Sequence, residues 1–435
     1  MIQAAERYFE FEKLGTNWRT EILAGATTFA AMAYIAVVNP SILQDAGMPF
    51  RAVAAATCFS AAVGSILMGA FARYPIALAP GMGLNAYFTY TVVKGMGIPW
   101  QTALGAVFVS GVAFLLLTAV GIRQWIMQAI PRELYASISA GIGLFIAFIG
   151  LRNAGIVVAS PATQVTLGNL HDPKTLLAVF GLIAMGALMA RGVRAAILIG
   201  IAATALLGSL TGLFAISAGS YAIADISLTA GQLQIGPALK LGALEVVFVF
   251  LFVDLFDNIG TLVGVGSKAQ LFDESLKIPR LSRIFWCDAT ATVVGSLSGT
   301  STVVSYIESA AGVAAGGRSG VTAIVTGLFF LVTLAATPFL GSIPSQATAP
   351  ALILVGSLMA SHMSEVRWND PTIAIPSFLT MLLIPLTYSI ATGLSCGFIV
   401  YALLRLLQGK ARKEDWLVYL LAALFMARFA YLSAG

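Results

Sequence analysis

Three acids stand inside apolar stretches of the chain and are the residues best suited to do chemistry. Asp254 and Asp257 lie in one such stretch, and Glu308 lies in another. An acid within a membrane span is energetically costly, so it is a functional-site candidate by default. Both stretches adjoin glycine-rich breaks. Paired breaks beside buried polar residues are typical of the binding site of a secondary transporter.

The first two acids are three residues apart, so they share one face of a helix. Asn258 adjoins that face. Two carboxylates this close in a dry site cannot both ionise easily, so we expect one of them to hold a proton at neutral pH. The only histidines, His171 and His362, lie near loops. A proton relay in this chain would therefore use carboxylates.

The composition is that of a membrane protein. Of 435 residues, 59% are hydrophobic and 10% are charged, whereas a soluble domain carries about 25% charged residues. The mean hydropathy is +0.91. Apolar runs close to the roughly 20 residues that cross a bilayer recur along the chain, and they include residues 22–43, 52–72, 102–120, 176–190, 195–214, 244–266 and 321–336. No long polar region between them indicates a separate soluble domain.

The net charge, the N-terminal residues and the cysteines bear on the binding partners, targeting and covalent cross-links of the protein. The net charge of +5 fits anionic lipid at a membrane surface better than nucleic acid. Residues 1–21 mix acids, bases and aromatics and lack the pattern of a signal peptide. The three cysteines, Cys58, Cys287 and Cys396, have no metal-ligand spacing and imply no disulfide or bound metal.

The basic residues predict an orientation. With the spans placed in order, 18 of the 24 Lys and Arg residues fall on the side of the N-terminus, five fall on the other side, and Arg428 is unassigned. The positive-inside rule makes the richer side cytoplasmic. We therefore expect a multi-pass protein of the cell inner (cytoplasmic) membrane with a cytoplasmic N-terminus.

A weak internal repeat relates the two halves of the chain. In the first copy, spans 22–43 and 52–72 precede a break at residues 74–87. In the second, spans 244–266 and 284–297 precede a break at residues 299–308. An odd number of spans separates the copies, so they run in opposite directions, which is the signature of an inverted repeat.

The two breaks should each open a helix inside the membrane. Pro75 and Pro80 oppose a continuous helix, and Gly81 permits close backbone approach. Irregular backbone at this depth survives only when it is buried or lines a cavity. Asn85 and Glu308 lie near the two helix starts, where unpaired N–H groups favour an ionised carboxylate.

These motifs resemble those of the AzgA-like purine permeases of the nucleobase/ascorbate transporter superfamily. The matching stretches are residues 15–21 (GTNWRTE), 27–35 (TTFAAMAYI), 81–88 (GMGLNAYF), 252–257 (FVDLFD) and 306–312 (YIESAAG). Similarity runs over nearly the whole chain. Any one of the stretches alone would be weak, but the combination is specific.

The resemblance implies an all-α polytopic fold of about fourteen segments in two inverted repeats of seven, residues 1–216 and 240–435. Core and gate domains would each be built from both repeats, and segments three and ten would each hold a short strand and a half-helix. It implies a proton-coupled symporter that imports purine nucleobases of the adenine, guanine and hypoxanthine class. Its partners would be the base, protons and membrane lipid, and the protein could form a homodimer. It would use no cofactor beyond the proton gradient.

The resemblance also assigns roles to individual residues. Asp254 and Glu308 match the acids that bind the base, and Asn85 matches a polar contact on segment three. Asp257 and Asp288 match function-linked acids, so proton coupling falls to Asp257, Asp254 and Asp288. Further substrate-binding candidates are Gly83, Tyr306, Ile307, Thr28 and Phe29. The uracil-type relatives carry a histidine near the segment-eight acid, which this chain lacks, so their proton pathway does not transfer.

Several alternatives stay open at this point. Asp254 and Asp257 could bond neighbouring helices, Glu308 could be only a helix cap, and Asn85 could be an inter-helix hydrogen bond. An anion carrier of the same general fold is the second transporter hypothesis, although it would favour basic residues at the site. An enzyme is disfavoured because the sequence has no His-Glu-x-x-His motif and no convincing nucleophile–base pair.

The C-terminal part also allows two interpretations. Spans fit residues 372–388 and 390–407, followed by an apolar run at 416–434. Pro376 and Pro385 could reduce the first of these to a partial span, and the last run could cross the membrane or lie in the interface.

Overall fold

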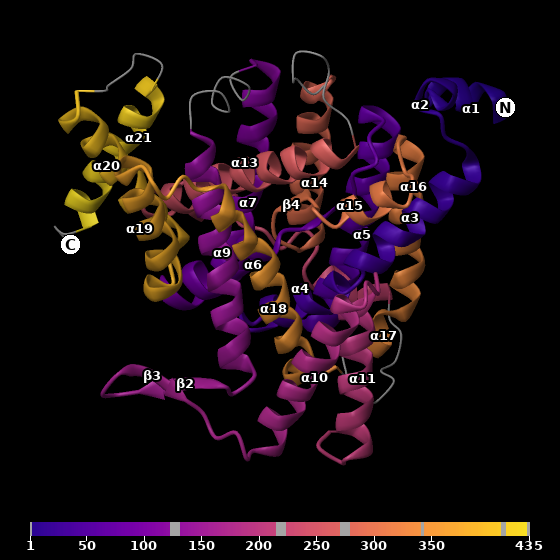
Figure 1. Cartoon of the computed structure of the whole chain (residues 1–435), viewed down its shortest axis with the longest axis horizontal. Helices are drawn as coiled ribbons and strands as arrows, with labels where there is room; N and C mark the ends of the chain where they lie inside the picture. The colour runs from indigo at the N-terminus through magenta and orange to yellow at the C-terminus, as the bar shows by residue number, and fades with distance from the viewer. Residues whose placement is uncertain are drawn as a thin grey trace. The chain divides into compact units, whose positions relative to one another are not determined.

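The chain is described by a computed structural model that covers residues 2–121, 131–214, 223–269, 279–340, 343–409 and 415–432. The chain divides into two compact units (Figure 1). The larger unit combines Met1–Leu116 with Gly150–Leu352, and the smaller unit combines Leu117–Ile149 with Ile353–Gly435. Each unit therefore draws on both halves of the sequence.

The larger unit begins with the helices of the first half. These are α1 (Ile2–Tyr8), α2 (Phe11–Leu14), α3 (Trp18–Met32), α4 (Ile35–Gln44), α5 (Phe50–Leu67), the π-helix η1 (Met68–Ala72), strand β1 (Leu78–Pro80), α6 (Met82–Ala86), the π-helix η2 (Tyr87–Gly95), α7 (Trp100–Ala119), α10 (Pro173–Ala190) and α11 (Ala196–Leu210). The break that the sequence predicts after α5 is present, and β1 and α6 follow it directly.

The second half of the sequence contributes a matching series to the same unit. It comprises the 3₁₀ turn η3 (Ile223–Leu228), α12 (Ile235–Ala238), α13 (Leu241–Ala269), α14 (Leu281–Ser298), strand β4 (Val303–Ser305), α15 (Ser309–Ala314), α16 (Gly320–Thr333), the 3₁₀ turn η4 (Leu334–Ala336), α17 (Thr337–Leu340) and the first part of α18 (Ser345–Ala360). Strand and half-helix again follow a long helix and a shorter one, as the repeat predicts.

The smaller unit contains most of α9 (Arg132–Asn153) with the 3₁₀ turn η5 (Ser361–Glu365), α19 (Pro371–Thr387), α20 (Ile390–Leu407) and α21 (Trp416–Leu432). Pro376 and Pro385 both lie inside α19, which runs through them as one helix. At 17 residues it belongs to the shorter apolar helices rather than to those long enough to cross a membrane, so its interpretation as a partial span stays a prediction. The position of α21 relative to a membrane stays a prediction.

The two predicted breaks pair with each other. Strands β1 and β4 form an antiparallel pair with Ala79 opposite Val304. The pairing extends past the strands, since the Gly81 N–H donates to Thr302 O over 2.9 Å and the Tyr306 N–H donates to Ala77 O over 2.9 Å. This short sheet satisfies backbone groups that a broken helix would leave unpaired in an apolar interior. It also brings the starts of α6 and α15 to one place.

A second antiparallel pair, β2 (Val157–Ser160) with β3 (Gln164–Leu167), is a hairpin in the connection to α10 (Figure 1). The sequence analysis did not predict it. Its strands are too short and too exposed to stand out among the apolar spans.

Helices of the larger unit approach one another through glycine. A Cβ added to Gly69 would lie 2.2 Å from the carbonyl oxygen of Gly320, and one added to Gly320 would lie 2.0 Å from that of Gly69. The π-helix η1, which continues α5, and the start of α16 therefore touch backbone to backbone, as small residues permit between membrane helices. Seven helices among the described residues are long and apolar enough to cross a membrane, and shorter apolar helices accompany them.

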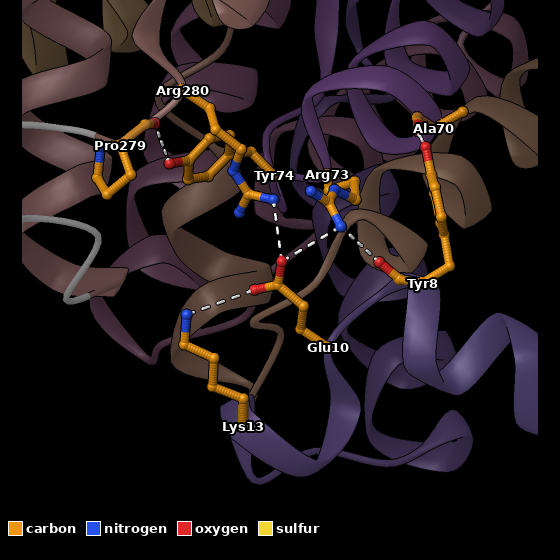
Figure 2. A network of polar contacts seen from close by, with 8 residues as sticks. All are labelled: Tyr8, Glu10, Lys13, Ala70, Arg73, Tyr74, Pro279 and Arg280. Carbon is orange, nitrogen blue, oxygen red and sulfur yellow. Dashed lines mark hydrogen bonds and ion pairs between the residues drawn. The ribbon is translucent and has the colours of Figure 1, made fainter.

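A polar network ties the N-terminal helices to both halves of the larger unit (Figure 2). Glu10 Oε1 lies 3.2 Å from Nη1 of Arg73, at the end of η1, and 3.3 Å from Nη1 of Arg280, just before α14. The Arg73 guanidinium also lies over the ring of Tyr8, and that of Arg280 lies over the ring of Tyr74. One carboxylate thus joins a segment of the first half of the sequence to a segment of the second half.

Candidate functional site

The side-chain amide of Asn258 links two of the predicted acids, one on the long helix α13 and the other on α14. Asn258 Nδ2 donates to Asp254 Oδ1 over 2.8 Å and to Asp288 Oδ2, on α14, over 2.7 Å. The Asn258 carbonyl accepts the backbone N–H of Ser305, in β4, over 3.1 Å. All four residues are buried. Asn258 therefore connects two carboxylates to the strand that precedes the second half-helix.

Asp257 faces the other break. Its Oδ2 lies 3.6 Å from the position that a Cβ on Gly81 would take, next to the start of α6. It also interacts electrostatically with the Tyr306 phenol, whose hydroxyl donates to the carbonyl of Pro80 over 2.6 Å. Asp254 and Asp257 thus share a helix but serve different neighbours, one towards α14 and one towards the β1–α6 junction.

Glu308 lies at the start of α15, as the sequence predicts. Its side chain makes no capping hydrogen bond to that helix, so the interpretation as a cap alone finds no support. Instead Oε1 accepts a hydrogen bond from the hydroxyl of Tyr34, a fully buried residue at the junction of α3 and α4. No ion pair to Glu308 occurs among the described residues. The carboxylate is held by a neutral donor from the opposite repeat.

Asn85 has the free hydrogen-bonding capacity that a ligand site needs. It lies on α6, is fully buried, and neither its Oδ1 nor its Nδ2 has a hydrogen-bond partner within the described ranges. Burying an amide without partners costs about 1–3 kcal/mol per group. The interpretation as an inter-helix hydrogen bond is therefore not what the structure shows. The role of Asn85 as a substrate contact stays a prediction.

Other hydroxyls in this part of the larger unit share that property. They are buried and have no partner among the residues that the structure describes, and they belong to Thr28, Thr89, Ser301, Thr302 and Ser305. The hydroxyl of Thr28 also lies against α15, since a Cβ on Gly312 would meet it at 2.0 Å. Segments α3, α6 and the β4 region thus all contribute unoccupied donors and acceptors.

The remaining predicted residues lie as follows. Gly83 is buried in α6, and Ile307 is 37% exposed beside Glu308. The ring of Phe29 stacks on Phe329 with 5.2 Å between centroids and meets Phe330 edge-on. Phe29 therefore packs α3 against α16, and its expected role as a base contact stays a prediction.

The sequence does not single out Tyr34 and Glu21, two buried residues with long-range partners, and it marks Asn258 only as a neighbour of the paired acids. Tyr34 lies inside the stretch 27–35 that carried the resemblance, and Asn258 directly follows the FVDLFD stretch, so each had a signal nearby. Glu21 is also fully buried, and it bonds the start of α16 rather than the acids. Only the fold shows which partners these residues meet.

The polar groups of the site are suited to hydrogen bonding. Among the described residues, no group of three or more His, Cys, Asp or Glu side chains could hold a metal. Its known polar groups are an unpartnered amide, several hydroxyls and carboxylates. Such a set suits a neutral polar ligand that presents N–H donors to the acids and both donors and acceptors to the amide.

The chain is closely similar to known permeases. It is 52% identical to the permease MJ0326 of Methanocaldococcus jannaschii, over 100% of both chains. It is 45% identical to the guanine/hypoxanthine permease PbuG of Bacillus subtilis (98% of this chain, 99% of the relative). It is 43% identical to the adenine permease AdeP of Escherichia coli (99% of this chain, 96% of the relative).

The fold is also found in a solved structure, the transmembrane domain of a cyanobacterium bicarbonate transporter, BicA. The TM-score is 0.63 at 15% identity, over 88% of this chain and 97% of that one. This likeness confirms the expected helical architecture of two inverted repeats of seven segments. The profile of the Permease family matches residues 19–430. The chain therefore belongs to the Permease family and is a multi-span membrane transporter, not an enzyme.

Proposed function

We propose that this protein is a proton-coupled symporter that imports purine nucleobases across the cell membrane. The observation that carries the proposal is the pairing of β1 with β4. It places Asn85, with an unpartnered amide, and Glu308, with one carboxylate oxygen bonded by Tyr34, at the starts of two half-helices from opposite repeats. Relatives at 43–45% identity over almost the whole chain bear the names adenine permease and guanine/hypoxanthine permease.

A purine base fits the chemistry of these groups. The base is neutral and planar, and its edges carry ring N–H donors together with nitrogen or oxygen acceptors. Glu308 would accept an N–H of the base, and the Asn85 amide would both donate and accept. Asp254 would provide a second carboxylate acceptor. Because the negative charge stays on the protein, the ligand itself need not be charged to bind tightly.

Proton coupling rests on the acids of α13 and α14. One amide, Asn258, donates to both Asp254 and Asp288, so these two carboxylates share a donor in a buried place. Burying two carboxylates close together costs less free energy when one of them is protonated. Asp257 lies separately, near Gly81 and Tyr306. We assign substrate contact to Asp254 and proton release and uptake to Asp257, with Asp288 as the alternative carrier.

The second candidate is an anion carrier, favoured by the likeness to the bicarbonate transporter's fold. That likeness extends to the fold alone. A carboxylate at the start of α15, held by a tyrosine hydroxyl, opposes an anionic substrate. For a purine importer we further propose a cytoplasmic N-terminus, because the N-terminal side carries most of the Lys and Arg residues.

Uptake measurements test the proposal. Cells that lack their own purine permeases would express the chain and be given radiolabelled adenine, hypoxanthine and guanine, with and without a protonophore. Concentrative uptake that the protonophore abolishes is expected. Bicarbonate or sulfate uptake without purine uptake would instead establish the anion carrier.

One variant connects this activity to the site. Glu308→Gln keeps the size of the side chain but turns one acceptor into a donor. A charge-assisted hydrogen bond contributes on the order of 1.5–3 kcal/mol, so the apparent affinity should fall by roughly 10- to 100-fold. Glu12→Gln, at an exposed position of α2, is the matched control. Unchanged purine affinity in Glu308→Gln, at normal membrane abundance, would remove Glu308 from the site.

A further inference from the structure

Tyr34 lies next to Glu308 and can influence how a purine base forms hydrogen bonds with that carboxylate. It is fully buried between α3 and α4, and its hydroxyl donates to Oε1 of Glu308, 274 residues further along the chain. Glu308 Oε2 accepts no hydrogen bond from another described residue. The two oxygens of this carboxylate are therefore unequal, because a tyrosine from the opposite repeat bonds Oε1 and not Oε2. The backbone N–H of Glu308 itself also donates to the carboxylate.

The junction that holds this pair is rigid. A Cβ on Gly312 would lie 2.7 Å from the backbone carbonyl of Ala24 and 2.0 Å from the Thr28 hydroxyl, so α15 packs directly on α3. Glu308 directly precedes α15, and Tyr34 lies in the short turn between α3 and α4. Neither residue can move far without separating these two segments. The phenol is thus a fixed neighbour of Oε1.

The titratable groups around Glu308 do not replace this bond. Tyr306 precedes it, and the Tyr306 hydroxyl is taken up by the Pro80 carbonyl. The packed helix α13 carries Asp254 and Asp257, which accept rather than donate when ionised. A ligand N–H can therefore supply a further donor to Glu308.

We propose that Tyr34 is a positioning residue that makes Glu308 a one-oxygen acceptor and so sets the selectivity among purines. This inference rests on the proposed purine transport. A ligand edge with two adjacent N–H donors bonds a carboxylate best in a bidentate manner, one donor to each oxygen. Tyr34 already bonds Oε1, so a second ligand donor would have to share that oxygen with the phenol. A ligand edge with a single N–H donor can still bond Oε2, so the Tyr34 bond to Oε1 costs it no hydrogen bond.

Hypoxanthine and guanine separate these two cases. They differ by the 2-amino group, which places a second N–H donor beside N1–H in guanine. In the wild-type protein this extra donor should therefore add little affinity. Without the Tyr34 hydroxyl, Oε1 becomes available, and guanine should gain a second charge-assisted bond that hypoxanthine cannot form.

The test is competition of radiolabelled hypoxanthine uptake by unlabelled hypoxanthine and guanine, in wild type and in Tyr34→Phe. We expect the two bases to compete within about threefold of each other in wild type. In Tyr34→Phe the ratio should shift towards guanine by on the order of tenfold, the effect of one hydrogen bond to a charged group. Tyr74→Phe is the matched control, since it removes a buried hydroxyl that donates to the backbone carbonyl of Pro279 instead of to Glu308.

The outcomes are distinct. An unchanged ratio in Tyr34→Phe, with equal loss for both bases, would overturn the inference. So would a wild-type protein that already prefers guanine by tenfold or more, a measurement that needs no variant to fold. A shift of the same size in Tyr74→Phe would also overturn it, because selectivity would then follow from the loss of any buried tyrosine hydroxyl. If wild type takes up no purine at all, the proposed function fails, and that result differs from purine uptake with a fixed ratio.

Discussion

Replacing Glu21 with glutamine should lower the stability of the fold while leaving purine affinity unchanged. Glu21 is a fully buried carboxylate on α3. Oε1 accepts the Thr16 hydroxyl over 2.7 Å and the backbone N–H groups of Arg318 and Ser319 over 3.0 and 3.2 Å. Oε2 accepts the Thr322 hydroxyl over 2.6 Å. One side chain thus joins α3 to the first turn of α16.

The magnitude follows from the number and kind of these bonds. Hydrogen bonds to a charged group contribute about 1.5–3 kcal/mol each, although they are not additive. Glutamine keeps one oxygen and removes both the charge and the second acceptor, so we expect a loss of roughly 2–4 kcal/mol. Alanine would leave the N–H groups at the start of α16 without partners and should be worse, by analogy with the roughly 3–5 kcal/mol for breaking a buried ionic contact.

The assay is heating of detergent-purified protein followed by size-exclusion chromatography, which gives the temperature at which half the protein stays monodisperse. We expect Glu21→Gln to lose several degrees and Glu21→Ala to lose more. Glu12→Gln changes an exposed acid of α2 and should behave as wild type. The reasoning is wrong if Glu21→Gln is as stable as Glu12→Gln, or if it is stable but weakens purine competition as Glu308→Gln does.

Three further predictions concern coupling, packing and the N-terminal network. Asp257→Asn, a permanently neutral mimic of the protonated acid, should bind purine but lose uphill accumulation while retaining base exchange; concentrative uptake with the wild-type pH dependence would contradict this. Gly69→Ala should reduce the amount of folded protein in the membrane, because its Cβ would meet Gly320 O at 2.2 Å; Gly186→Ala, with nothing within 4 Å, is the control. Glu10→Gln breaks ion pairs of partly exposed groups, so it should destabilise the fold by only about 0–1 kcal/mol. The same heating assay should then give a midpoint temperature close to that of wild type. A midpoint as low as that of Glu21→Gln would show that the network is structurally essential.

The acids of the candidate site depend on a neutral polar residue that positions them. Asn258 was noted in the sequence only as a neighbour of the paired acids. In the structure it donates to Asp254 and Asp288 and accepts from Ser305. An amide can serve as donor and acceptor at once, which a third carboxylate could not. The acids are therefore positioned by neutral residues that stand out less in a hydropathy pattern.

The sequence by itself determined the membrane class, the positions of the breaks and the acids of the site. Each follows from local physics. Long apolar runs require a bilayer or a core. Pro75, Pro80 and the nearby glycines oppose a helix wherever they stand, and an acid in an apolar run is conspicuous at any position. The pairing of β1 with β4 agrees with this local prediction because both breaks need partners for their backbone groups.

Only the tertiary structure decided which of these residues meet. The Tyr34–Glu308 bond joins positions 274 residues apart, and Glu21 meets Ser319 across 298 residues. No periodicity or propensity encodes such pairs, because they depend on how α15 and α16 pack against α3. The same packing places Phe29 against Phe329, although its sequence context suggested a ligand contact. Local composition therefore fixes what each segment is, whereas long-range packing fixes which side chains share a site.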